Sequence, residues 1–408
     1  MPEALSVSTQ AQKRHDLIAA IEAERDSKVI TYFLGDRQGA AAQIAEDAVR
    51  PMYDHLQVVP SSAKNIDLFL YSVGGFTDIP WRIVTMIREF TNRFTVLVPY
   101  KAMSAATMIA LGADEIVMGR KGELGPIDPQ LNIRRGGEGG TAVHEQIAVE
   151  DIMAYVRFLR EKAGLTDQSA LTGPLSALAG KLDPWTLGQI NRAHSHIRTV
   201  ARKLLTARKE NAFDEQKIQV IVDTLAEKTY QHGHAIGRQE AQEIGLKVIQ
   251  PPDNMEGILW DLYQAYEGVC RLREPIEFRA FIPSGQDEHS ERIVMGCMES
   301  TALAHHFAAE LRGRNKRQPP PQLNLTLNLQ LPPTVDPQQL SAEAQQAMQA
   351  LMQQFQQQAR GVLQQELRRQ MPVTGFEGGI QGGAWRRIDD WPASKIAVET
   401  VPATAPRG

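Results

Sequence analysis

Ser104 is the residue whose type and position point most clearly to chemistry. It follows Phe94–Pro99, a short apolar and β-branched run typical of a buried strand, and it precedes Ala105–Ala113, whose small residues favour a helix. A serine at such a turn has its hydroxyl at a helix N-terminus, where unpaired amides and the helix dipole stabilise negative charge. The position suits a nucleophile, and it equally suits a serine that only caps the helix.

Two adjacent glycines occupy a second strand-to-helix turn. Ile66–Tyr71 predicts a buried strand that leads into Gly74 and Gly75, and we expect Thr77 to cap the next helix, with Pro80 in its first turn. Adjacent glycines let the backbone turn tightly and leave N–H groups without side chains in the way. Acyl transfer needs such N–H groups to hold an oxyanion. Considered alone, the pair also fits an ordinary tight turn.

The elements that would position these turns alternate along the first part of the chain. Lys28–Leu34 is the first expected strand, a helix bearing Ile44 and Met52 follows, and Glu115–Met118 is a further strand. Such alternation predicts an α/β domain with a largely parallel sheet and right-handed crossovers.

Three segments, Ser72–Gly75, Ala102–Met118 and Leu124–Gln130, together resemble the serine dehydrogenase proteinase family. That family is part of the Clp protease and crotonase superfamily, alongside the Clp proteolytic subunit and signal peptide peptidase A. The similarity spans Arg14–Ile249 and implies a Clp protease/crotonase-like ββα spiral. No Gly-x-Gly-x-x-Gly fingerprint follows a strand, so the sequence indicates neither a dehydrogenase nor a nucleotide cofactor.

The resemblance also implies roles for individual residues. Ser104 would be the nucleophile, and an oxyanion would lie near the backbone N–H groups of Gly74 or Gly75 and of Ala105. No metal ion is expected to take part, because no cluster of His, Cys, Asp and Glu has suitable spacing.

The general base is open among three residues. Asp128 stands where Clp subunits have a histidine, and His144 lies in the region where signal peptide peptidases have a lysine. Lys121 is close to the site in sequence, but no motif assigns it. Because a serine without a base is nearly inert, a catalytically degenerate member of the superfamily is a real alternative.

The sequence therefore predicts a serine endopeptidase that cleaves unfolded or peptide substrates through an acyl-enzyme on Ser104. The first alternative is an oligomeric scaffold or binding protein with the same fold. The second is a crotonase-type acyl-thioester enzyme, which would share the oxyanion hole but usually depends on carboxylates around it. The superfamily typically assembles as trimers or hexamers, so we expect a homo-oligomer. No Gly-x-x-x-x-Gly-Lys-Ser/Thr motif occurs, so any unfoldase would be a separate chain.

Composition is that of an ordinary globular protein. The 408 residues are 42% hydrophobic and 23% charged, and a net charge of −4 argues against nucleic acid or an anionic membrane as a partner. No apolar stretch reaches the roughly 18 residues of a spanning helix, and no signal peptide is visible. Cys270 and Cys297 are the only cysteines, which excludes a disulfide framework and fits a cytoplasmic protein. His232 and His234 are expected to be structural or to line the substrate site, and His305 and His306 to lie at the surface.

We expect four regions along the chain. The hydrolase core spans 1–275, and a small α/β extension, 276–317, contains two strands, Glu277–Ile282 and Glu291–Met295, and a helix, Ser300–Gly313. Residues 318–371 form a Pro/Gln-rich linker, a strand with alternating leucines from Leu323 to Leu331 and an amphipathic helix, Ser341–Gln370. The tail, 372–408, is expected to be partly disordered. Since one strand and one helix cannot bury both apolar stripes, this appendage should serve assembly or bind a separate partner protein.

Overall fold

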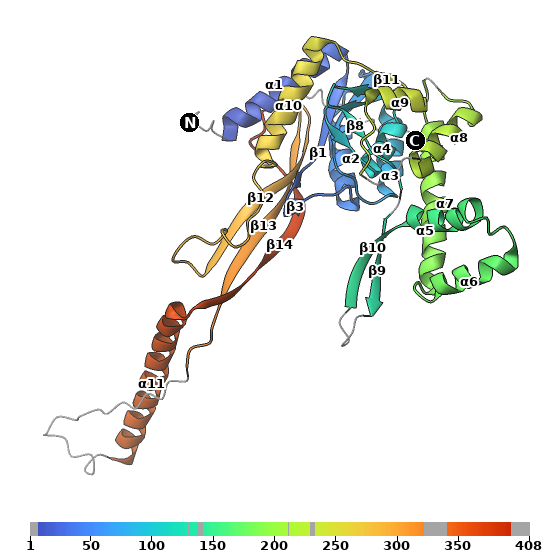
Figure 1. Cartoon of the computed structure of the whole chain (residues 1–408). Helices are drawn as coiled ribbons and strands as arrows, with labels where there is room; N and C mark the ends of the chain where they lie inside the picture. The colour runs from blue at the N-terminus through green and yellow to red at the C-terminus, as the bar shows by residue number, and fades with distance from the viewer. Residues whose placement is uncertain are drawn as a thin grey trace, which may run out of the picture. The chain divides into compact units, whose positions relative to one another are not determined.

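The computed structural model describes residues 7–128, 130–136, 142–210, 212–228, 233–321 and 341–392 (Figure 1). The chain forms two compact units. The first comprises Met1–Pro275, Ile293–Ala309 and Gly383–Gly408, and the second comprises Ile276–Arg292 and Glu310–Gly382. Three long strands, β12 (Glu288–Glu299), β13 (Ala304–Arg317) and β14 (Val373–Arg387), have residues in both units.

The central sheet has the strand order β11-β7-β5-β4-β1-β12-β13-β14. Its first five strands are parallel, and β12 pairs antiparallel with β1. Their bounds are β1 Lys28–Leu34, β4 Asn65–Tyr71, β5 Arg93–Val98, β7 Glu115–Met118 and β11 Val248–Ile249. Strands β1, β4 and β5 are buried at every residue but the first, as expected for parallel strands that are covered on both faces. The sheet confirms the predicted α/β fold and the strands predicted in the first 118 residues.

Short strand segments follow each main strand and form a second layer. β6 (Lys101–Ala102) pairs parallel with β8 (Glu123–Leu124), Ser72 bridges Ala102, and Ile44 bridges Gly75. After the short segment the chain enters a helix three times, at α2 (Val49–Gln57), α3 (Ile79–Phe90) and α4 (Ala105–Leu111). This recurrence of strand, short strand and helix is the ββα spiral implied by the resemblance.

Two helix starts differ from the expectation. Ile44 lies in a bridge rather than in a helix, because its N–H donates to the Gly74 carbonyl and its own carbonyl accepts from Phe76; the first turn after it is the 3-10 helix η1 (Glu46–Ala48). Helix α3 has Pro80 in its first turn as predicted, but its N-cap is Asp78 and no side chain caps it.

Helices α1 (Val7–Arg25) and α10 (Asp253–Val269) pack against each other (Figure 1). Together they cover one face of the sheet, over a core in which the ring of Phe33 stacks on Tyr71 at 4.4 Å and on Tyr266 at 5.0 Å. Because side chains alternate along strands, the other residues of β1, β4 and β5 face the opposite side. The remaining elements of the first unit are β2 Asp36–Arg37, β3 Ala40–Ala41, β9 Gln130–Gly136, β10 Ala142–Ala148, α5 Val149–Arg157 with the π-helical turn Phe158–Lys162, α6 Gln168–Ala179, α7 Pro184–Thr206, α8 Glu215–Asp223 with the π-helical turn Thr224–Lys228, and α9 Arg238–Ile244.

The later part of the chain corrects two expectations and shows order in part of the tail. Ser300–Gly313 is not a helix, since most of it is β13, where sheet partners override the helix propensity of alanine and leucine. Glu277–Ile282 forms turns instead of a strand. Part of the expected tail is ordered: β14 continues the sheet, and the Trp391 indole, 7% exposed, donates to the Ser300 carbonyl at 2.8 Å.

Helix α11 (Ala342–Gln370) confirms the predicted long helix in the second unit. The alternating leucines, Leu323–Leu331, lie outside the described residues. Over the described ranges, none of the helices combines the length and apolar character needed to cross a membrane.

Candidate functional site

Ser104 lies between β6 and α4 in an unusual backbone conformation. Its φ is 52° and its ψ is −115°, a region that residues other than glycine rarely adopt. The hydroxyl makes no capping hydrogen bond to the helix that it precedes, and the residue is half-buried. The structure therefore does not support a mere capping role, and backbone strain of this kind is often found at functional sites.

The Gly74–Gly75 turn lies directly against Ser104. A Cβ added to Gly74, whose φ is +116°, would come within 2.9 Å of the Ser104 Cβ and 3.3 Å of its Oγ. Two backbone hydrogen bonds keep the turns in register: Ser72 N–H donates to the Lys101 carbonyl at 3.0 Å, and Met103 N–H donates to the Ser72 carbonyl at 2.9 Å. The short second-layer strands thus bring together two turns that are separate in the sequence.

The N–H groups of the two glycines have different surroundings. Gly74 N–H donates to the Ser72 Oγ at 3.0 Å. The Ile44 N–H donates to the Gly74 carbonyl, and the Phe76 N–H donates to the Ile44 carbonyl, both at 2.9 Å. Backbone groups alternate in direction along an extended segment, so the Gly75 N–H, which lies between these two bonds, points away from Ile44. Among the described residues none accepts a hydrogen bond from Gly75 N–H or Ala105 N–H, so neither donor is occupied by this part of the chain.

Asp128 is buried at the end of a segment that is fixed to the Ser104 turn. Gly125 N–H donates to the Thr107 Oγ1 at 2.9 Å, and this hydroxyl in turn donates to the Ala102 carbonyl at 2.7 Å. A Cβ on Gly125 would lie 2.9 Å from the Met103 Cε. Thr107, in the first turn of α4, therefore connects the helix that follows Ser104 to the segment that leads to Asp128.

The surroundings of Lys121 do not suit a general base. Its Nζ is 3.1 Å from the Glu123 carboxylate and 4.7 Å from the Tyr100 ring centroid, and its side chain is exposed. The hydrogen bond to Glu123 raises the pKa of Lys121, whereas a lysine base needs a lowered pKa to accept a proton near neutral pH.

His144 lies on β10, where its backbone is opposite Arg134 of β9. These two strands form a separate two-stranded sheet. Of the expected substrate-lining histidines, His232 lies outside the described residues, and His234 bonds to Glu240 at 2.9 Å.

Sequence reasoning assigned no role to three residues that shape this site. Ser72 orients the Gly74 N–H, Thr107 connects two segments, and Ile44 packs its backbone where a Gly75 side chain would be. Ser72 could have been found, since it begins the Gly-Gly motif. The part played by Ile44 depends on a pairing between distant segments that no local pattern shows.

His305 and His306 are not at the surface as expected. His305 is buried, with its Nδ1 3.2 Å from the His55 Nε2, and burial followed by the charge of His305 lowers the pKa of His55 to about 3. His306 is partly buried and bonds to Glu299 at 2.9 Å. Both histidines lie on β13, where the sheet encloses them.

Glu299, His306 and Cys297 place potential metal ligands within 4.8 Å of one another. The Glu299 carboxylate, however, already binds the Arg14 guanidinium through two contacts of 2.9 Å and accepts from the Tyr266 hydroxyl at 2.7 Å. Burial lowers the pKa of His306, but Cys297 and Glu299 together raise it to about 10. Cationic side chains thus occupy the positions that a metal would need, and the cluster is a structural ion-pair network.

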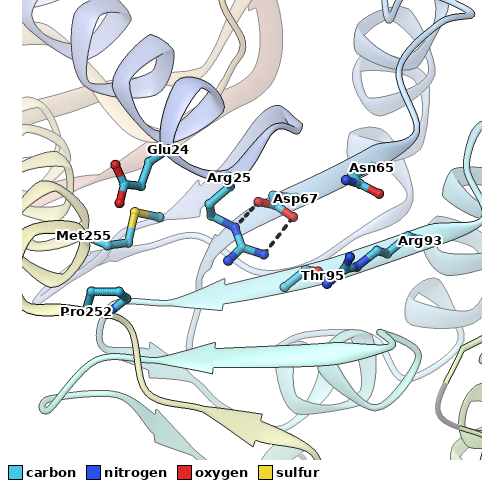
Figure 2. Close-up of a pocket in the computed structure, with 8 residues that line it drawn as sticks. All are labelled: Glu24, Arg25, Asn65, Asp67, Arg93, Thr95, Pro252 and Met255. Atoms are coloured by element: carbon cyan, nitrogen blue, oxygen red, sulfur yellow. Dashed lines mark hydrogen bonds and ion pairs between the residues drawn. The ribbon is translucent and has the colours of Figure 1, made fainter.

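A cavity of about 280 Å³ lies at the amino ends of β4 and β5, the opposite ends from the Ser104 turn (Figure 2). Figure 2 shows the Arg25 guanidinium directed at Asp67, with which it pairs; the Ser27 hydroxyl also donates to Asp67 at 2.9 Å. Ligands of parallel α/β sheets bind beyond the carboxyl ends of strands. The cavity is therefore distinct from the candidate catalytic site.

The fold and the two facing turns define an α/β protein of the Clp protease and crotonase-like class. Residues 1–136, about a third of the chain, match the family of ClpP-like SDH-type serine proteinases. The match confirms the resemblance indicated by the sequence. It contains Gly74, Gly75, Ser104 and Asp128, and it ends before His144.

Two uncharacterized proteins of Methanocaldococcus jannaschii are similar in sequence. MJ0137 is 28% identical over 218 residues, which are 53% of this chain and 64% of that protein. MJ1495 is 24% identical over 183 residues, which are 45% of this chain and 51% of that protein. The chain thus spans less than two thirds of either relative.

Solved structures with similarity to the chain include two proteases. A membrane-bound stomatin-specific protease has 16% sequence identity and a TM-score of 0.33, over 59% of this chain and 86% of that chain. ClpP1 from Listeria monocytogenes has 12% identity and a TM-score of 0.31, over 62% of this chain and 99% of that chain.

Proposed function

We propose that this protein is a serine peptidase that cleaves peptide bonds in peptides or unfolded proteins through an acyl-enzyme on Ser104. The observation that carries the proposal is the Ser104 turn itself. Ser104 is half-buried, has a positive φ and does not use its hydroxyl to cap the helix that follows. It faces a glycine turn, and the N–H groups of Gly75 and Ala105 are available beside it. The match to ClpP-like serine proteinases over the same residues supports this reaction class.

The proposed reaction uses these groups in the following steps. The Ser104 Oγ attacks the carbonyl carbon of a peptide bond, and its proton passes to a general base. The negative oxygen of the tetrahedral intermediate accepts hydrogen bonds from Gly75 N–H and Ala105 N–H. The C–N bond then breaks, the amine leaves with the proton, and water hydrolyses the resulting ester on Ser104.

For the base we retain His144 and Asp128 and disfavour Lys121. A histidine has an ordinary pKa near the working pH, which suits proton transfer, and a buried carboxylate can either accept the proton or orient a histidine. His144→Gln should lower turnover by roughly 10²- to 10⁴-fold if His144 is the base. An unchanged rate in His144→Gln together with a comparable loss in Asp128→Asn would assign the proton transfer to Asp128.

The proposal is tested by labelling the native protein with a fluorophosphonate probe and mapping the modified peptide. We expect the label on Ser104, its loss in Ser104→Ala with the fold retained, and full labelling in Ser62→Ala, because Ser62 is an exposed serine before the amino end of β4, whereas the glycine turn follows the carboxyl end of that strand. A label on another serine would refute the assignment. A folded wild-type protein that takes no label would favour the non-hydrolytic scaffold with the same fold.

We further propose that the peptidase acts as a homo-oligomer. The ClpP-like family match is consistent with assembly, and α11 leaves large apolar side chains exposed in the single chain. Size-exclusion chromatography with light scattering would give the mass per particle directly. A monomer at micromolar concentration would contradict this part of the proposal and leave the labelling result unaffected.

A further inference from the structure

Helix α11 is a long helix whose two ends are defined by hydrogen bonds. Its N-cap, Ser341, accepts a hydrogen bond from Ala344 N–H at 3.3 Å. At the other end, Arg317 of β13 donates to the Met371 carbonyl at 2.7 Å and to the Asp287 carboxylate at 2.6 Å. At 1.5 Å per residue, the 29 residues extend for about 43 Å. A helix so well defined at its ends presents a fixed surface along its length.

One side of that surface is apolar and exposed. Leu351, Phe355, Val362 and Leu363 are 66%, 60%, 69% and 44% exposed. At 100° per residue these four side chains fall within a sector of about 120°. Met348, Met352 and Ala359 share this sector, and we call these seven residues the α11 stripe. An isolated helix is only marginally stable in water, so a helix with such a stripe needs a partner to cover it.

The order of side chains along the stripe is nearly symmetric about its midpoint. If two copies of the helix lie antiparallel and cross at Phe355, Met348 of one faces Val362 of the other, and Leu351 faces Ala359. A two-fold contact requires such self-complementarity, because the same patch must serve on both sides. The stripe therefore fits a second copy of itself.

The charges of α11 distinguish the antiparallel from the parallel arrangement. The only charged residue in its first half is Glu343, whereas its second half carries Arg360, Glu366, Arg368 and Arg369. An antiparallel pair brings the acidic first turn beside the basic last turn and also opposes the helix dipoles. A parallel pair would set the arginines of the two last turns beside each other, which is unfavourable.

We propose that the α11 stripe is a homodimerisation surface, on which two copies of this chain form an antiparallel helix pair centred on Phe355. The inference deepens the proposed homo-oligomer and does not depend on peptidase activity. The experiment below distinguishes a second copy from a segment of the same chain or another protein on the stripe.

Cysteine cross-linking in the full-length protein tests the pair and its orientation. Both native cysteines are buried, so an added cysteine reports on α11. Under mild oxidation Phe355→Cys should give a disulfide-linked dimer, because this residue lies next to the two-fold axis. Ala344→Cys alone should not, since its symmetry mate would be about 33 Å away along the pair. Ala344→Cys combined with Glu366→Cys should restore the cross-link, and Gln357→Cys on the opposite side should give none.

A dimer of Ala344→Cys alone would overturn the antiparallel arrangement. No cross-link in either Phe355→Cys or the double variant, with the protein folded, would overturn the pair itself. As a second measurement, Phe355→Glu should lower the mass per particle in light scattering, whereas Gln353→Glu, on the polar side, should not. An unchanged mass in Phe355→Glu would show that something other than a second copy covers the stripe. Fluorophosphonate labelling of Ser104 is measured in the same variants. The labelling tests the peptidase proposal and the cross-links test the helix pair, so either can fail without the other.

Discussion

At the scale of single residues, Gly75 is constrained by the backbone next to it. A Cβ at this position would lie 2.2 Å from the Ile44 carbonyl oxygen and 2.4 Å from its nitrogen, and neither backbone atom can move without breaking the bridge. We expect Gly75→Ala to destabilise the fold by about 1–3 kcal/mol or more, as overpacking does. Urea denaturation measures this, with Gly237→Ala as the control, since a Cβ there meets nothing within 4 Å. Equal stability of the two variants would contradict the packing argument.

The Ser72 hydroxyl offers a test that leaves the glycines unchanged. In Ser72→Ala the Gly74 N–H loses its acceptor, and the turn that presents the Gly75 N–H is less well fixed. Removing one partner from a buried hydrogen bond costs about 1–3 kcal/mol, and we expect fluorophosphonate labelling of Ser104 to slow by roughly tenfold as the oxyanion donors lose their alignment. Labelling at the wild-type rate would show that Ser72 stabilises the turn without affecting the reaction.

At the scale of elements, Thr107 connects α4 to the segment that carries Asp128. Thr107→Val keeps the shape of the side chain but removes the hydroxyl that Gly125 N–H and the Ala102 carbonyl share. We expect a loss of about 2 kcal/mol in the free energy of unfolding, because a buried donor is left unsatisfied. Thr85→Val on α3 is the matched control: its hydroxyl bonds only to carbonyls of its own helix, so the change should be within about 0.5 kcal/mol.

The elements also show which parts of the structure can be predicted from local sequence. Lys28–Leu34 was predicted and found with the same bounds, because a run of apolar, β-branched residues between turns has few other structures available. Ser300–Gly313 was predicted to be a helix, because alanine and leucine favour one, and only the strands beside it make it β13. At the site, motif and resemblance indicated the Ser104 and Gly-Gly turns. Their alignment depends on Ile44 and Ser72, whose pairings are not local and could not be predicted.

At the scale of the whole molecule, the Glu299 network joins the first helix to the late strands. Burial raises the pKa of Glu299, but Arg14 and His306 outweigh it and hold this pKa at about 2, below its ordinary 4.5. The ionised Glu299 carboxylate therefore stabilises the folded protein; this contribution is complete above pH 4.5 and is lost as the pH falls towards 2. His306 has its pKa raised from 6.5 to about 10, so its contribution is complete below pH 6.5 and is lost as the pH rises through 10.

The network should therefore stabilise the protein most between about pH 4.5 and 6.5. We expect His306→Gln to lower the melting temperature most at pH 5.5, where an effect of about 1.5–3 kcal/mol is reasonable for a hydrogen bond to a charged group. The difference from wild type should shrink by pH 10, because wild-type His306 is then losing its proton. Thermal denaturation of both proteins across this range is the measurement, and a difference that stays constant to pH 10 would contradict the role of His306.

The discontinuous first unit has a consequence for how the protein is made. Its core is closed by Trp391, whose ring lies 6.0 Å from His15 and 5.5 Å from the Arg14 guanidinium, both on the first helix. During synthesis about 80 residues must be added after Ala309 before Trp391 is itself incorporated, which takes roughly 4–16 s at 5–20 residues per second. Throughout this interval the nascent chain has most of its parallel sheet but lacks the segment that covers the start of α1. A ribosome-bound chain that ends before Gly383 should therefore be more sensitive to protease than the released protein, and it is the stage at which a chaperone would bind.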